Sequence, residues 1–127
     1  MAAFIIVLGM LISSEIGRLT RGFNDISPND VTLLMNHNTA VLVDIRTAAE
    51  NREGHILNSK HIPTGELTTR VSELEKHKQD HVIAYCRSGS RSIAACKILK
   101  TQGFENVHNL GGGIMAWESA NLPTTKN

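Results

Sequence analysis

One stretch of this chain limits its fold more than any other, because a short apolar run, a polar turn and a helix-forming run follow one another directly. The apolar run is Val82-Ile83-Ala84-Tyr85, the turn is Cys86-Arg87-Ser88-Gly89-Ser90-Arg91-Ser92, and the helix-forming run begins with Ile93-Ala94-Ala95. This order predicts a buried strand followed by a helix. Cys86 is therefore expected at the carboxyl end of a strand, close to a helix N-terminus.

The turn is suited to holding a negatively charged sulfur. Backbone N–H groups at such a turn and the positive end of the helix dipole both favour an anion and lower the pKa of a thiol. Gly89 can adopt a positive φ, Ser92 is placed to cap the helix, and Arg91 is expected to add a positive charge beside the thiolate. The alternative is a tight turn around an inert cysteine, for which two arginines are poorly suited. We predict that Cys86 is the nucleophile and that its binding loop consists of Arg87, Ser88, Gly89, Ser90, Arg91 and Ser92.

Four segments resemble, in order and spacing, the motifs of the rhodanese-type sulfurtransferases. The turn at Cys86–Ser92 resembles the active-site loop of that family. The other three segments are Val41-Leu42-Val43-Asp44-Ile45-Arg46, Glu50-Asn51-Arg52-Glu53-Gly54-His55-Ile56 and Leu110-Gly111-Gly112-Gly113-Ile114-Met115-Ala116-Trp117. Asn51 stands where the family usually has an aromatic residue, which is expected to weaken a local packing contact. Leu57-Asn58-Ser59 replaces the usual Pro-Gly-Ala, and neither departure touches the loop.

The chain is expected to form one α/β domain over residues 22–127, with a central, mostly parallel sheet flanked by helices on both faces. The resemblance implies the same rhodanese-like architecture. Aromatic residues make up only 4% of the chain, which suits an aliphatic parallel sheet. A helix is predicted to begin at Ser27-Pro28, with its buried side formed by Val31, Leu33, Leu34 and Met35. Strands are predicted at Val41–Asp44, His61-Ile62, Val82–Tyr85 and Asn106–Asn109, and Gly103 is predicted to end the helix that follows the turn.

Residues 1–21 are predicted to form a separate apolar helix. Ala2 to Ile12 is an uncharged run of eleven residues, which at helical rise spans about 16 Å and is too short to cross a membrane alone. Three interpretations stay open: the end of a transmembrane helix, an interfacial or packing helix, or a leader. If the segment is an anchor, Arg18 and Arg21 favour a cytoplasmic domain held at the inner face of the membrane.

Charge, cysteines and histidines exclude several classes of function. A net charge of +1 with interspersed signs argues against a nucleic-acid surface. The two cysteines suit a reducing compartment, and Cys96 is expected to be a buried helix residue rather than a resolving thiol for Cys86. The histidines lack metal-ligand spacing, so no metal is predicted; they are His37, His55, His61, His77, His81 and His108.

Five residues outside the turn are predicted to support the site structurally. Asp44, Arg46 and Glu50 are expected to form an ion-pair and hydrogen-bond cluster that braces the first central strand. The resemblance gives His55 a structural hydrogen-bonding role. Trp117 is expected to close the core near the C-terminal helix.

The resemblance implies a sulfurtransferase without a cofactor. Cys86 would take a sulfane sulfur from thiosulfate or a similar donor as a persulfide and pass it to cyanide, a thiol or a protein acceptor. Arg87 and Arg91 are expected to position the anionic donor. One alternative is a non-catalytic interaction module at the membrane. Another is a cysteine phosphatase or arsenate reductase, but those enzymes have five residues between cysteine and arginine, whereas four separate Cys86 from Arg91.

Overall fold

A five-stranded parallel sheet forms the centre of the molecule. The structure is a computed structural model that describes residues 22–37 and 39–127. The strand order is β1-β6-β5-β2-β4, and every neighbouring pair is parallel. The strands are β1 (Phe23–Ile26), β2 (Ala40–Asp44), β4 (Lys60–His61), β5 (His81–Tyr85) and β6 (Asn106–Leu110). The predicted mostly parallel α/β fold is thereby confirmed.

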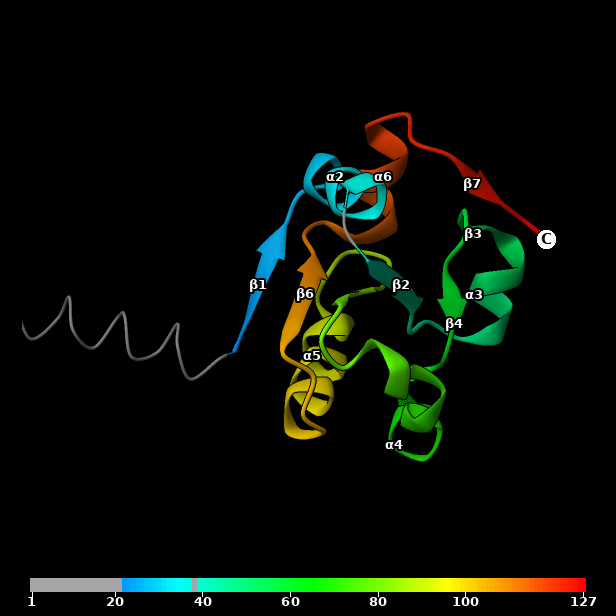
Figure 1. Cartoon of the computed structure of the whole chain (residues 1–127). Helices are drawn as coiled ribbons and strands as arrows, with labels where there is room; N and C mark the ends of the chain where they lie inside the picture. The colour runs from blue at the N-terminus through cyan, green and yellow to red at the C-terminus, as the bar shows by residue number, and fades with distance from the viewer. Residues whose placement is uncertain (1–21, 38) are drawn as a thin grey trace, which may run out of the picture.

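Helices cover both faces of this sheet (Figure 1). α2 (Pro28–His37) and α6 (Gly113–Ser119) lie on one face. The other face carries α5 (Arg91–Thr101) and a chain of short helical turns, which are η1 (Thr64–Glu66), α4 (Leu67–Arg70) and η2 (Val71–His77). The remaining elements lie on the side of the sheet where β4 forms the edge (Figure 1): they are α3 (Ala48–Glu53) and the antiparallel pair of β3 (His55–Ile56) and β7 (Thr124–Thr125).

The position of β5 in the centre of the sheet explains why its sequence is continuously apolar. Val82 and Ala84 point into the cluster under α5, whereas Ile83 and Tyr85 point into the cluster under α2 and α6. All four are 0% exposed. A strand that is buried on both faces needs no alternation of polar and apolar residues.

Helix α2 begins where the sequence predicts. The Ser27 hydroxyl accepts a hydrogen bond from the Asp30 N–H at 3.1 Å, and the Asp30 carboxylate accepts one from the Ser27 N–H at 3.3 Å. Val31 is buried, but Leu33 is 55% exposed, so its predicted place on the buried side is wrong. At 3.6 residues per turn, the buried face of this helix follows residues 31, 34 and 35, and Leu33 falls outside it.

The structure tests the prediction for Trp117 but not the one for residues 1–21. The apolar segment predicted at residues 1–21 lies outside the described residues. In the described part of the chain, no helix has both the length and the apolar character needed to cross a membrane. Trp117 is only 5% exposed and packs in the cluster under α2 and α6, as predicted, with its indole N–H donating to the Pro123 carbonyl at 2.9 Å.

Candidate active site

Cys86 directly follows β5, in the middle of the sheet and at its carboxyl edge. The start of α6 holds the first two carbonyl groups of the loop. The Ile114 N–H donates to the Cys86 carbonyl at 2.9 Å, and the Met115 N–H donates to the Arg87 carbonyl at 3.1 Å. The following backbone therefore turns with its N–H groups toward the sulfur rather than away from it.

Two donors from the loop and from α5 contact the sulfur of Cys86. The Gly89 N–H lies 3.1 Å from Sγ, and the Ser92 hydroxyl oxygen lies 3.4 Å from it. Gly89 has a φ of +96°, which a residue with a Cβ adopts only with strain. The Cys86 side chain is 0% exposed. Cys86 is thus a buried thiol surrounded by hydrogen-bond donors.

The net effect of this environment is to lower the pKa of the Cys86 thiol. Burial raises the pKa, because it disfavours the thiolate. The Ser92 hydroxyl and the N–H groups of Ser92, Gly89 and Ser88 lower it by donating to the charged form, and together they outweigh burial. A thiol with a lowered pKa has more of the nucleophilic thiolate at neutral pH.

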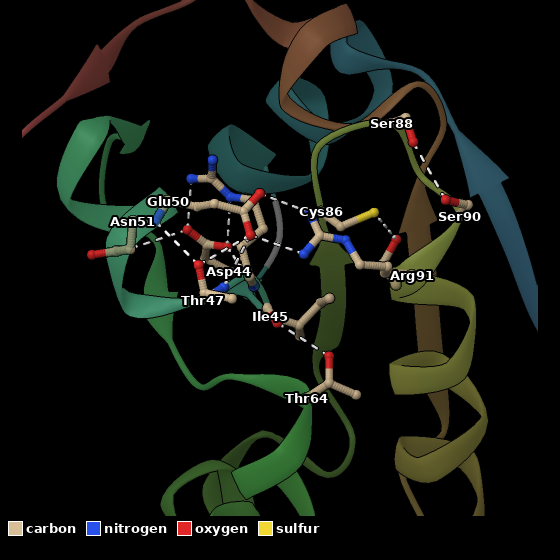
Figure 2. A network of polar contacts seen from close by, with 12 residues as sticks. Asp44, Ile45, Thr47, Glu50, Asn51, Thr64, Cys86, Ser88, Ser90 and Arg91 are labelled. Carbon is tan, nitrogen blue, oxygen red and sulfur yellow. Dashed lines mark hydrogen bonds and ion pairs between the residues drawn. The ribbon is translucent and has the colours of Figure 1, made fainter.

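Ser92 does not cap α5, so that prediction is wrong. The helix starts at Arg91 with Ser90 at the N-cap position, and no side chain caps it. Ser92 therefore lies within the first turn, fully buried, where its hydroxyl contacts both the Cys86 sulfur and the Asn109 side-chain oxygen. Ser90 and Ser88 are exposed, and their hydroxyl groups lie 3.3 Å apart (Figure 2).

The guanidinium of Arg91 reaches across to Glu50 rather than donating to the sulfur (Figure 2). Its two terminal nitrogens lie 2.9 and 2.7 Å from the two carboxylate oxygens. Glu50 also accepts hydrogen bonds from the backbone N–H and hydroxyl of Thr47, the N-cap residue of α3. This ion pair ties the start of α5 to the start of α3. Hydrogen bonds from Arg91 and Thr47 outweigh burial and lower the pKa of Glu50 to about 2.

Replacing Glu50 by Gln is expected to reduce stability by about 0.5–1 kcal/mol at neutral pH, because the pair is partly exposed. Gln can still accept the capping bond, so the substitution removes mainly the charge. A carboxylate whose pKa is lower in the folded than in the unfolded protein stabilises the fold at pH values above its unfolded pKa. It loses that contribution as the pH falls toward its folded pKa. The difference between wild type and Glu50→Gln in urea unfolding should therefore be full above pH 4.5 and vanish toward pH 2.

Glu53→Gln is the matched control for this prediction. Glu53 lies on the same helix and has no ion-pair partner among the described residues. A pH-independent difference between wild type and Glu50→Gln, or an equal pH-dependent loss in Glu53→Gln, would show that the Arg91 pair does not stabilise the fold.

Asp44 and Arg46 form the predicted ion pair at the end of β2. The Asp44 carboxylate is buried and accepts from Arg46 Nε at 2.9 Å, from Arg46 Nη2 at 2.8 Å and from the Arg46 N–H at 2.9 Å. Arg46 also donates to the Gly54 carbonyl at 2.7 Å. Glu50 was predicted in this cluster, but it bonds to Thr47 and Arg91 instead, because α3 turns its side chain toward α5 (Figure 2).

The first sequence departure is accommodated by hydrogen bonds and the second by a backbone conformation that suits asparagine. Asn51 donates to the Asp44 carboxylate at 3.0 Å, and its carbonyl lies 3.0 Å from Nδ1 of His55. The Asn51 side chain thus supplies a hydrogen bond in place of the packing contact that was expected to weaken. Asn58 has a φ of +68°, a conformation that Asn tolerates better than most residues with a side chain.

A cavity of about 420 Å³ adjoins the loop. It carries charges of both signs, and Arg87 is the loop residue that reaches it. Its lining consists of Arg46, Glu50, Glu53, Gly54, Arg87, Ile114, Met115 and Glu118. Within residues 22–37 and 39–127, no three His, Cys, Asp or Glu side chains are arranged to hold a metal ion. The charged lining of this cavity suits a small polar molecule.

Sequence reasoning missed Asn109 and Asp25. Asn109 is 1% exposed at the end of β6, and its side-chain nitrogen lies 3.0 Å from both the Asp25 carboxylate and the Gly89 carbonyl. The neighbouring glycines follow Asn109 in the closing motif, but nothing in the sequence places this side chain behind Cys86. Cys96 lies buried in α5 with its sulfur 3.5 Å from the His108 carbonyl.

Comparison with known proteins identifies relatives over most of the chain. Residues 27–120 match the family described as the rhodanese-like domain. A sulfurtransferase of Allochromatium vinosum is 46% identical over 83 residues, which cover 65% of this chain and 76% of the relative. The uncharacterized protein YibN of Escherichia coli K12 is 33% identical over 125 residues, which cover 98% of this chain and 87% of the relative.

A solved structure shows the same fold. The crystal structure of a rhodanese-related protein from Thermoplasma volcanium aligns with a TM-score of 0.73 and 28% sequence identity. The alignment covers 82% of this chain and 99% of the other.

Proposed function

Since this chain belongs to the rhodanese-like domain family, we propose that it transfers a sulfane sulfur through a persulfide on Cys86. A sulfurtransferase-type role is supported by the relatives. The donor, the acceptor and the persulfide intermediate are our proposal. The observation that carries it is the ring of donors around the Cys86 sulfur, in which the Gly89 N–H lies 3.1 Å from Sγ.

The proposed reaction has two displacement steps at sulfur. The Cys86 thiolate attacks the outer sulfur of thiosulfate or a similar donor, a new S–S bond forms, and sulfite leaves with the electron pair of the broken S–S bond. A thiolate, cyanide or a protein acceptor then attacks the outer sulfur of the persulfide and releases the Cys86 thiolate. N–H groups of the loop would stabilise the anionic sulfur in both steps. No cofactor takes part.

The buried position of Cys86 sets a requirement on this reaction. The side chain is 0% exposed, so the loop must open or the side chain must turn before a donor can reach the sulfur. The adjoining cavity offers room for a small donor, and Arg87 supplies a positive charge there. We propose Arg87 as the residue that positions an anionic donor, and Arg91 chiefly as the partner of Glu50.

The phosphatase alternative is disfavoured by the position of Arg91. A phosphoryl group bound in the loop would need a guanidinium that points into the ring. Both terminal nitrogens of Arg91 are instead bonded to Glu50. The loop is also one residue shorter than in those enzymes, since four residues separate Cys86 from Arg91.

Intact-mass measurement after incubation with thiosulfate tests the proposal. We expect a mass gain of one sulfur atom that a reducing thiol removes and that Cys86→Ser lacks. No gain in a protein whose Cys86 reacts with an alkylating agent would refute the persulfide and favour a non-catalytic interaction module. Hydrolysis of an aryl phosphate in place of sulfur transfer would favour the phosphatase.

The cellular setting is part of the same proposal. A cytoplasmic domain, held at the membrane through residues 1–21, would act on a small sulfane donor and on a thiol or protein acceptor without binding nucleic acid. Fractionation of cells that produce the full chain tests the anchoring. Recovery of the protein only in the soluble fraction would exclude a stable membrane anchor.

A further inference from the structure

A chain of polar side chains links the Cys86 sulfur to the edge strand β1, and its two members nearest the sulfur, Ser92 and Asn109, are buried whereas Asp25 is exposed. It runs from Cys86 to Ser92 on α5, from Ser92 to Asn109 on β6, and from Asn109 to Asp25 on β1. Asp25 and Asn109 are register partners in the parallel pair of β1 and β6. Ser92 and Asn109 are 0% and 1% exposed, so water cannot replace their partners.

The partners of Asn109 determine which way its amide points. The amide nitrogen lies 3.0 Å from the Asp25 carboxylate and 3.0 Å from the Gly89 carbonyl. Both groups only accept hydrogen bonds, so the two N–H bonds of Asn109 must face them. The amide oxygen is then left facing the Ser92 hydroxyl, to which it is an acceptor.

The Ser92 hydroxyl therefore faces two acceptors with a single proton. If its proton goes to Asn109, its oxygen can only accept from the S–H of a Cys86 thiol. If the hydroxyl instead turns its proton to a Cys86 thiolate, the buried Asn109 oxygen loses its donor. An unsatisfied buried acceptor is unfavourable, so the thiolate gains less from Ser92 than the 3.4 Å contact alone suggests.

We propose that Asn109 is a positioning residue that competes with the Cys86 sulfur for the single hydroxyl proton of Ser92. The competition makes the ionisation of Cys86 depend on a side chain that does not touch it. Asp25 and the Gly89 carbonyl act one step further back, because they hold the amide in the orientation that competes. The proposal takes Cys86 as the nucleophile of the proposed function, but its test requires no sulfur transfer.

The experiment measures the rate at which iodoacetamide alkylates Cys86 as a function of pH, followed by mass spectrometry of the Cys86 peptide so that Cys96 does not contribute. We expect Asn109→Leu to lower the pKa of the Cys86 thiol by about one pH unit, because the hydroxyl proton is then free for the sulfur. Below the pKa, alkylation should become about threefold faster, because the roughly tenfold larger thiolate fraction is partly offset by the lower intrinsic nucleophilicity of the thiolate.

A double-mutant cycle separates this effect from a distorted loop. Asn109→Leu also removes the bond to Gly89, and any resulting loop movement would act with or without Ser92. In the Ser92→Ala background, we therefore expect Asn109→Leu to leave the pKa nearly unchanged. An equal shift in both backgrounds, or a raised pKa in Asn109→Leu, would overturn the proposal.

One further variant keeps the test decisive. Ser92→Ala alone should raise the pKa by less than about half a unit if Asn109 competes, and by a unit or more if Ser92 serves only the sulfur. The larger rise would overturn the proposal even if Asn109→Leu failed to fold. Every variant retains the other charged groups around Cys86, which are Arg87, Arg91, Glu50, Asp44 and Arg46.

Discussion

Replacing Cys86 by Ser is expected to abolish sulfur transfer, with the turnover rate falling by a factor on the order of 10⁴ or more. A serine hydroxyl would not be ionised at neutral pH and cannot form a persulfide. The substitution changes one atom at a position surrounded by the Gly89 N–H and the Ser92 hydroxyl, both of which can also bond to oxygen. Thermal unfolding should therefore show a folded protein.

Cys96→Ala is the matched control for the Cys86 variant. Cys96 is also buried, but it lies in α5 with its sulfur near the His108 carbonyl, away from the loop. We expect this variant to lose some stability and to keep sulfur transfer, measured by release of sulfite from thiosulfate. Retained transfer in Cys86→Ser, or an equal loss in Cys96→Ala, would contradict the role assigned to Cys86.

Replacing Gly113 by Ala is expected to destabilise the protein by about 2–5 kcal/mol. Gly113 has a φ of +59°, and a Cβ built on it would collide with the carbonyl oxygens of Cys86 and Arg87. These are the two carbonyls that accept from the N–H groups of Ile114 and Met115. The chain can relieve the collision only by moving the loop or α6, which breaks those bonds.

The change is measured by urea unfolding, together with alkylation of Cys86 at neutral pH. We expect alkylation to be faster in Gly113→Ala, because a displaced loop exposes the sulfur. Gly65→Ala is the control, since its Cβ would meet no atom within 4 Å and its φ is not positive. A Gly113 variant as stable as the Gly65 variant would show that α6 does not hold the loop in this position.

The sequence errors at Ser92 and Glu50 have the same physical origin. Ser92 was expected to cap the helix because serine follows a turn, but α5 begins at Arg91 with Ser90 at the N-cap position, so Ser92 already lies inside the helix. Glu50 was expected to join Asp44 and Arg46, which lie close to it in sequence, but its strongest partner, Arg91, is 41 residues away. Propensity and proximity describe local structure, and neither identifies a partner that the fold brings from elsewhere.

Strands β1, β3 and β7 were not predicted for a related reason. β1 contains Asn24 and Asp25 and lies at the edge of the sheet, so it lacks the apolar run that marks a buried strand. β3 and β7 have two residues each, too few to show a pattern. Strands β2 and β5 were predicted because burial on both faces imposes an apolar composition that is visible in the sequence.

The sequence by itself determined the alternation of strands and helices, the position of Cys86 after a buried strand and the family of its motifs, because each depends on residues that are neighbours in the chain. Tertiary structure alone decided which distant residues contact the loop that holds the sulfur. Parallel pairing of β1 with β6 brings Asp25 to Asn109. Packing of α5 on the sheet brings Ser92 to both Asn109 and Cys86. These contacts join residues 17 and 84 positions apart, and only the packed sheet brings such distant residues together.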